Sequence, residues 1–238
     1  MLRRTLLALP LAAAAAKPAT RFDERLGDLI YETPMDTEAS VSGWRMEGKG
    51  TVAHHRGWME MWSPGEQTHH VYWCPQPAPA SFAAEWTCRN LHPEAGLCIV
   101  FFCATGNDGE DVLDPTLPPR DGTFSQYNKG ALDNYHVSYY ANTPNTPNRP
   151  VARLRKNPGA NIVQEGPRGI LAASTDIHRV RLLKDSARIE MWVDDRQILD
   201  WTDDGAVLGP AYGAGKLALR QMRWTQFAYR DFRLWSLS

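Results

Sequence analysis

The segment from His178 to Asp204 reads HRVRLLKDSARIEMWVDDRQILDWTDD and decides the fold class. It divides into HRVRLLK, RIEMWVD and ILDWTDD, with the short polar connections DSA and DRQ between them. Short runs rich in apolar and β-branched residues, bounded by Asp and Ser, are typical of antiparallel strands joined by tight turns. The segment therefore predicts a three-stranded meander.

Strand signals of the same kind recur along most of the chain, and no stretch has the periodicity of a long amphipathic helix. A chain of 238 residues with 43% hydrophobic residues can bury a sizeable core. About a dozen short strands, no internal repeat and no linker predict an all-β fold in one domain over residues 19–238. The other strand-like runs cover residues 69–75, 81–90, 97–104, 134–141, 151–157, 215–222 and 229–237.

The first twenty residues, MLRRTLLALPLAAAAAKPAT, combine a basic start, an apolar run and a small-residue end. This pattern predicts a signal peptide over residues 1–18, with cleavage near Ala16, and hence a secreted or periplasmic protein. A membrane anchor is the less favoured alternative, because the run is short, contains Pro10 and is mostly alanine. The net charge of −1 gives no reason to expect nucleic acid or a membrane surface as a partner.

Four cysteines, Cys74, Cys88, Cys98 and Cys103, show neither a CxxC motif nor a zinc-ligand spacing. Cys98 and Cys103 fall on one predicted strand, about 16 Å apart at roughly 3.3 Å per residue, so they cannot bond to each other. Buried free thiols are the preferred prediction. One disulfide involving Cys74 or Cys88 is the alternative in an oxidising compartment.

Several motifs occur in an order and spacing that resemble the YesU-like family of bacterial concanavalin A-like proteins. The resemblance runs from about Trp73 to the C-terminus and departs near residues 143–150 and 167–175. It implies a concanavalin A-like β-sandwich (jelly roll) of two antiparallel sheets, and a place in systems that degrade rhamnogalacturonan and other uronate-containing polysaccharides. The motifs are HHVYWCP, EWTC, GLCIVFFCATGNDGEDVLDPTLPPRDGTFSQY, YHVSYY, LRKN, DDG and GKLALRQM.

Alternation along the predicted strands places unusual polar residues on shared faces. A face with His, Asn and Tyr is too polar for the core between two sheets and suits a polysaccharide-binding surface. The predicted outward sets are Asn134, His136, Ser138 and Tyr140 on one strand, Arg153, Arg155 and Asn157 on the next, and Glu85, Thr87 and Arg89 on a third.

β-Elimination or dehydration on a uronate needs a group that neutralises the carboxylate, a base for the C5 proton and an acid at the departing oxygen. His136 is predicted as base, Tyr139 or Tyr140 as acid, and Arg155 with Arg120 as the carboxylate clamp. A hydrogen-bonded structural role is the alternative for His136. Further predicted substrate contacts are Lys156, Asn134, Tyr127, His70, Glu85 and Gln221.

Acidic residues follow the apolar run 97–104, in a stretch without the EF-hand spacing. The segment 106–127 is predicted as a long ordered loop at the rim of the cleft, pinned by carboxylate–arginine pairs. No cofactor is predicted to be required, but Ca²⁺ held by Glu110, Asp111 and Asp114 is an alternative. The tandem pairs His54-His55 and His69-His70 can each offer only one side chain to a site, and His70 is expected to lie nearer the substrate.

The sequence leaves three functions open. The preferred one, on the family resemblance, is a lyase-type enzyme acting on uronate-containing oligo- or polysaccharides. The second is a glycoside hydrolase using paired carboxylates, such as Glu85 with Glu110 or Asp111. The third is a non-catalytic carbohydrate-binding protein.

Overall fold

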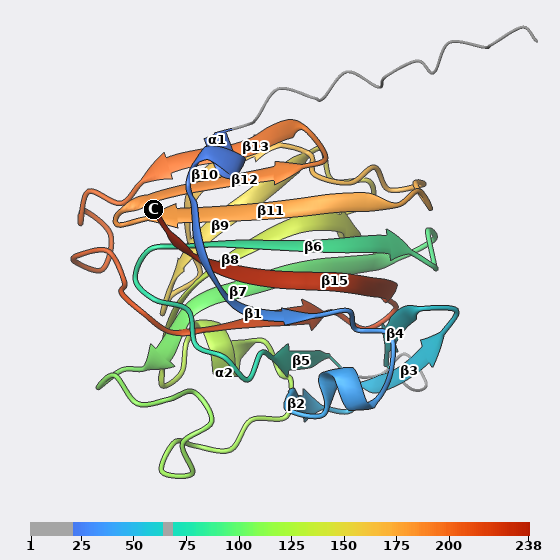
Figure 1. The fold of residues 1–238 in the computed structure, drawn as a ribbon, viewed down its shortest axis with the longest axis horizontal. Helices are drawn as coiled ribbons and strands as arrows, with labels where there is room; N and C mark the ends of the chain where they lie inside the picture. Colours follow the sequence, from blue (N-terminus) through green and yellow to red (C-terminus); the bar gives the residue numbers. More distant parts are fainter. Residues whose placement is uncertain (1–20, 64–68) are drawn as a thin grey trace, which may run out of the picture.

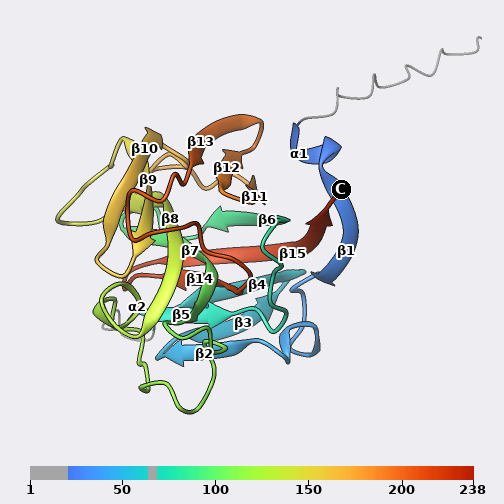
Figure 2. The same cartoon turned by 90° about the vertical axis from the view of Figure 1, so that its left-hand side faces the viewer.

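Two antiparallel sheets pack face to face in the computed structural model, which describes residues 21–63 and 69–238. The seven-stranded sheet lies on the left of Figure 2 and the eight-stranded sheet on the right. The predicted all-β sandwich of two antiparallel sheets is therefore confirmed. The predicted signal peptide, residues 1–18, lies outside the described residues.

The eight-stranded sheet has the strand order β13-β12-β11-β6-β15-β4-β3, with β1 added beside β15. Strands β1 and β15 come from opposite ends of the chain and lie side by side (Figure 1). The bounds are β1 (Leu26–Thr33), β3 (Thr51–His55), β4 (Trp58–Trp62), β6 (Phe82–Asn90), β11 (His178–Asp185), β12 (Arg188–Val193), β13 (Arg196–Thr202) and β15 (Gln226–Leu237).

The seven-stranded sheet has the order β10-β9-β8-β7-β14-β5-β2. In the described part of the chain, helices are confined to three short turns, and none of them is long and apolar enough to cross a membrane. The bounds are β2 (Arg45–Gly48), β5 (His70–Trp73), β7 (Gly96–Gly106), β8 (Leu132–Asn142), β9 (Val151–Asn157), β10 (Asn161–Pro167) and β14 (Lys216–Gln221), with α1 (Arg21–Glu24), η1 (Ala39–Val41) and α2 (Ser125–Asn128).

The predicted meander is present as β11, β12 and β13, joined by two-residue turns. The first turn residues, Ser186 and Asp194, have positive φ angles of 53° and 57°, a conformation that Asp and Ser tolerate better than apolar residues. Every predicted strand forms. Strands β1 to β4 and β10 were not predicted; β2, β3 and β10 lie at sheet edges, where short strands of mixed polarity give a weak pattern.

The main core fills the space between the sheets and is rich in aromatic rings. Trp86 stacks on Phe232 with ring centroids 6.4 Å apart and meets Tyr139 edge-on at 6.0 Å. All four cysteines are free and buried, as predicted, and no disulfide forms among them.

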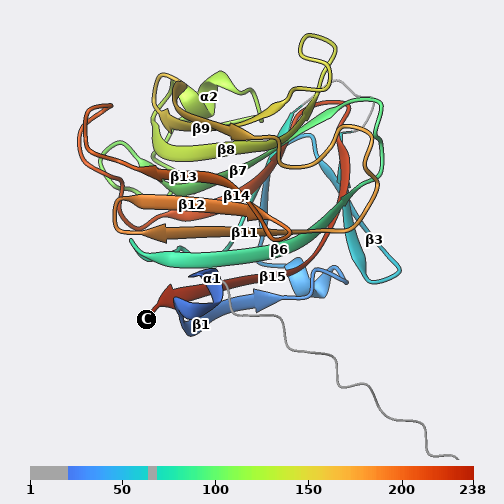
Figure 3. The same cartoon turned by 90° about the horizontal axis from the view of Figure 1, so that it is seen from above.

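A second apolar cluster lies on the outer face of the seven-stranded sheet, away from the other sheet. Trp73 and Phe101 on the strands contact Tyr127 and Val112 from the loop 107–131, which carries α2. Figure 3 shows α2 and β1 on opposite sides of the sandwich. The loop thus covers one part of this outer face and leaves the neighbouring part open.

Candidate functional site

A cavity of about 290 Å³ lies on the open part of this outer face, beside the loop 107–131. Its outstanding feature is its charge, because four arginines line it and no lining side chain among the described residues is a carboxylate. We call it the arginine pocket. It is lined by Arg149, Arg153, Arg155 and Arg220, with His69, Leu97, Ile99, Phe124, Ser138, Thr143, Asn145, Thr146 and Met222.

Strand alternation places the arginines here. In β9, Leu154 belongs to the core between the sheets, so Arg153 and Arg155 point to the outer face, as predicted. In β14, Leu217 and Leu219 belong to the core and Arg220 faces the pocket.

Arg220 is 2% exposed, yet its guanidinium has no anionic partner in the described part of the chain. Its Nε is buried without a hydrogen bond, and its Cζ lies 4.5 Å from the centroid of the Phe124 ring. Burial lowers the pKa of Arg220 to about 10. Arg220 therefore carries a desolvated positive charge that faces the Phe124 ring and has no anionic partner among the described residues.

The other three arginines of the pocket differ in the hydrogen bonds and ion pairs that their side chains make with the protein. Arg149 donates from Nε and Nη2 to the Val151 and Ser138 oxygens at 2.8–2.9 Å, and Arg153 pairs with Glu165 at 2.6 Å. The Arg155 side chain makes no hydrogen bond or ion pair within residues 21–63 and 69–238, and burial followed by repulsion from Arg153 lowers its pKa. Arg155 and Arg220 are thus the two guanidinium groups available to a ligand.

His69 adds a neutral donor to the arginine pocket. The Arg223 backbone N–H donates to His69 Nδ1 at 3.2 Å, which leaves the proton of the neutral ring on Nε2. Burial, and then the charges of Arg220 and Arg223, lower the pKa of His69 to about 4. Sequence reasoning favoured His70 over His69, and the structure reverses this order. His70 is fully buried, bonded to Ser63 Oγ at 2.9 Å, with its pKa lowered to about 3 by burial.

His136 does lie on the outer face of β8, but it is fully buried beneath the loop. Its ring meets Phe101 and Phe124 edge-on, each at 5.4 Å. Asn157 Nδ2 donates to His136 Nδ1 at 2.7 Å and to Asn134 Oδ1 at 2.8 Å, so the proton of His136 sits on Nε2, which has no partner. Burial holds its pKa well below the ordinary value. The predicted role of His136 as a base stays a prediction, and it would require Phe124 to move.

The prediction that Tyr140 shares a face with His136 is wrong. Opposite β7, the register shifts so that Ser138 pairs with Ile99 and Tyr140 with Cys98, which leaves one extra residue in β8. This β-bulge turns the strand, and both Tyr139 and Tyr140 face the core between the sheets. Neither tyrosine can contact a ligand in the arginine pocket.

Arg120 is not a substrate clamp, because Glu47 on β2 already neutralises it. Arg120 Nη2 and Nε donate to the Glu47 carboxylate at 2.6 and 3.1 Å, and Tyr127 Oη donates to it at 2.9 Å. Trp73 Nε1 adds a fourth bond at 2.9 Å. The predicted pinning of the loop by a carboxylate–arginine pair is confirmed, although the carboxylate comes from β2 and not from the loop acids.

Four further predicted contacts lie away from the arginine pocket. Lys156 is buried on the core side of β9, where it pairs with Asp203 at 2.7 Å. Gln221 is buried in the core beside Tyr229, and Glu85 belongs to the eight-stranded sheet. Asn134 is buried and donates to the Tyr127 carbonyl at 2.8 Å. These residues hold the fold around the site and do not form its surface.

The acidic side chains of the loop are engaged in local turns. Glu110 accepts from the Asp108 N–H at 3.1 Å, Asp111 pairs with Lys216 at 3.3 Å, and Asp114 accepts from both Thr116 donors. No group of three His, Cys, Asp or Glu side chains within the described residues is arranged to hold a metal ion. The Ca²⁺ alternative therefore finds no preformed cluster at these acids.

Sequence reasoning missed Arg220, Arg149, His69 and Phe124. The alternation of GKLALRQM, with its two leucines inward, could have identified Arg220 as outward-facing. Nothing local predicts that Phe124, from a loop, covers a strand residue 96 positions later in the chain.

The two antiparallel sheets and their strand order define a galectin-like jelly roll. A solved protein from Bacillus subtilis, described as having unknown function and a galectin-like fold, is 30% identical with a TM-score of 0.85, covering 89% of this chain and 97% of that one. The chain belongs to the DUF1961 family (Domain of unknown function), whose model matches residues 28–234.

Two further comparisons agree with this assignment. The "Uncharacterized protein YesU" of Bacillus subtilis (strain 168) is 31% identical over 209 residues, which covers 87% of this chain and 94% of that protein. The resemblance to the YesU-like family is thereby confirmed. The exoplasmic/lumenal domain of VIP36, in its Ca²⁺/Man3GlcNAc-bound form, shares the fold with a TM-score of 0.62 at 12% identity, over 89% of this chain and 91% of that one.

Proposed function

We propose that this protein recognises the anionic residue of a uronate-containing oligo- or polysaccharide in the arginine pocket. The observation that carries the proposal is the guanidinium of Arg220, which is buried at a cavity without any anionic partner in the described residues.

A buried charge without a partner costs several kcal/mol, so proteins rarely keep one that serves only the fold. A bound carboxylate would supply the missing charge and accept paired hydrogen bonds from the planar guanidinium. Arg155, the second arginine whose side chain has no partner among the described residues, lies in the same cavity. The charged side chains that line the site are all arginines, which is the composition expected for anion recognition.

A sugar acid is favoured over a simple anion by the rest of the lining and by the fold. Thr143, Asn145 and Thr146 offer polar side chains beside the charge, and Phe124 and Ile99 offer apolar contacts. Sugar hydroxyls and C–H faces need both kinds of partner. Galectin-like neighbours such as VIP36, solved with Man3GlcNAc, support a carbohydrate-related role for this architecture. A carbohydrate partner also agrees with the export expected from residues 1–18.

β-Elimination on the bound uronate is the second candidate. The arginine pair meets its first requirement, neutralisation of the carboxylate, and His69 Nε2–H could donate to the departing oxygen. A base is the missing element, because the described lining has no carboxylate and no tyrosine. Recognition without chemistry therefore stands first.

Isothermal titration calorimetry with oligogalacturonides and matched neutral oligosaccharides tests recognition. Arg155→Ala should weaken uronate binding by roughly 10–100-fold, the loss of one charge-assisted pair. Arg233→Ala, on the other sheet and paired with Glu32 at 3.8 Å, removes the same charge as a control and should leave affinity unchanged. Equal losses in both variants, or tighter binding of neutral sugars, would overturn the proposal.

An ultraviolet scan of the same mixtures distinguishes the second candidate. Absorbance from a new C4–C5 double bond would establish elimination, and new reducing ends without that absorbance would indicate hydrolysis. Binding without either product leaves recognition as the function.

A further inference from the structure

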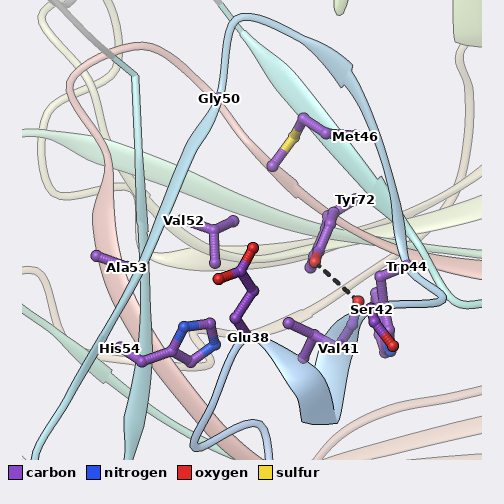
Figure 4. Close-up of a pocket in the computed structure, with 10 residues that line it drawn as sticks. All are labelled: Glu38, Val41, Ser42, Trp44, Met46, Gly50, Val52, Ala53, His54 and Tyr72. Atoms are coloured by element: carbon purple, nitrogen blue, oxygen red, sulfur yellow. Dashed lines mark hydrogen bonds between the residues drawn. The ribbon is translucent and has the colours of Figure 1, made fainter.

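A second cavity, of about 610 Å³, lies where the two sheets meet at their edges. Strand β2 is the edge of the seven-stranded sheet, β3 is the edge of the eight-stranded sheet, and the turn 48–50 joins them. We call this cavity the edge pocket. Figure 4 shows its lining residues: Glu38, Val41, Ser42, Trp44, Met46, Gly50, Val52, Ala53, His54 and Tyr72.

Polar and apolar groups both line the edge pocket, and the polar atoms of its aromatic side chains are already bonded. Trp44 Nε1 donates to Tyr31 Oη at 3.0 Å, and Tyr72 Oη donates to the Val41 carbonyl at 3.4 Å. The faces of Trp44 are covered by Tyr72 and Phe232, with ring centroids 5.1 and 5.3 Å away. The wall therefore offers C–H surface and ring edges but no open aromatic face.

Two polar side chains in this cavity have unused hydrogen-bonding capacity. The exposed Glu38 carboxylate makes no hydrogen bond or ion pair within residues 21–63 and 69–238, and His54 Nε2 is buried without a partner among the same residues. Figure 4 shows Glu38, His54 and Val52 pointing toward one another. Aliphatic side chains beside these convergent polar groups give the cavity both kinds of contact that a small polar molecule can use.

We propose that the edge pocket binds a neutral pyranose ring. The exposed Glu38 carboxylate would repel a uronate and can accept hydrogen bonds from ring hydroxyls, so this site differs in ligand preference from the arginine pocket. A second hydroxyl of the same ring would bond to His54 Nε2, and the ring's C–H groups would contact Val52 and Met46. A cationic amine is disfavoured because the covered faces of Trp44 offer it no cation–π contact.

The chain supplies a matched control for this site. His54 and His55 are adjacent on β3, so their side chains point to opposite faces, and only His54 lines the cavity. His55 is exposed. His54→Ala and His55→Ala therefore remove the same group from the same strand, inside and outside the site.

Saturation-transfer NMR with methyl glycosides of glucose, galactose and mannose tests the proposal on the full chain. At least one glycoside should receive saturation. Glu38→Gln and His54→Ala should each weaken its binding about tenfold, while His55→Ala and Arg155→Ala leave it unchanged. Glu38 is exposed, so its variant is expected to fold normally.

Three results would overturn the proposal. The first is no saturation of any neutral glycoside by the wild-type protein. The second is loss of the signal in Arg155→Ala with none in Glu38→Gln, which would place the neutral ring in the arginine pocket. The third is tighter binding of the corresponding amino sugar than of the neutral glycoside, with this preference abolished by Glu38→Gln. That result would show that the edge pocket binds a cation.

Discussion

Replacing Arg220 with methionine should stabilise the protein while abolishing its affinity for uronates. Arg220 is buried without a counter-ion, and burial lowers its pKa to about 10. Relative to an ordinary arginine this is a roughly 300-fold change in the protonation equilibrium, which corresponds to ~3 kcal/mol of lost stability. Methionine is of similar length and makes favourable contacts between its sulfur and an aromatic ring, here Phe124.

The lowered pKa of Arg220 also determines how the stability difference between the wild type and Arg220→Met changes with pH. The folded protein releases this proton at a lower pH than the unfolded chain does. The loss of stability caused by burying the charged Arg220 is therefore fully present below pH 10. It shrinks as the pH rises through the pKa of Arg220 in the folded protein. At neutral pH the variant should gain about 2–3 kcal/mol in its free energy of unfolding. For a chain of this size that is a rise in Tm of roughly 4–12 °C.

Urea unfolding followed by tryptophan fluorescence, with calorimetric titration of oligogalacturonides on the same samples, measures both effects. Arg153→Met is the matched control: its guanidinium is 30% exposed and paired with Glu165, so its removal should change stability by less than about 1 kcal/mol. A folded Arg220→Met variant that is less stable than the wild type would refute the reasoning. It would show that the guanidinium is compensated within the protein and is not held ready for an anion.

Three other predictions concern the surroundings of the site. Arg120→Ala should lower the free energy of unfolding in urea by ~3 kcal/mol, because the largely buried Glu47 loses its cation. Adding Glu47→Ala should recover part of that loss. Strictly additive losses in the double variant would contradict an energetic coupling between Arg120 and Glu47. Burial lowers the pKa of His70 from 6.5 to about 3, so only the unfolded chain binds its proton between these values. Stability should then fall by up to about 1.4 kcal/mol per pH unit as the pH drops from 6.5 towards 3, and His70→Asn should flatten that slope in pH-dependent urea titrations. Asp111→Asn removes the exposed partner of the buried Lys216, which keeps its hydrogen bond to the Pro75 carbonyl, so the change should cost less than about 1 kcal/mol. A chelator should leave the Tm unchanged, and a drop in Tm with chelator would revive the calcium alternative.

Local sequence patterns predicted much of the fold and half of the candidate site. The run VARLRKN forms β9 over the predicted residues, with Arg155 on the predicted face. The three-stranded meander also forms as expected, because its turn residues and apolar spacing are local signals. The same rule failed at Tyr140, where one inserted residue reverses the alternation.

The sequence by itself determined which residues point inward and outward along each regular strand, since a strand has a period of two residues. Only the tertiary structure decided which outward residues remain available. Arg120 and Lys156 were also predicted to contact the substrate, but Glu47 and Asp203, far away in the chain, neutralise them. Arg220 became the central residue for the opposite reason, because no anion reaches it within the described part of the chain. Charge pairing depends on distance in space, which strand patterns do not encode, and so the site emerged only when the sheets were assembled.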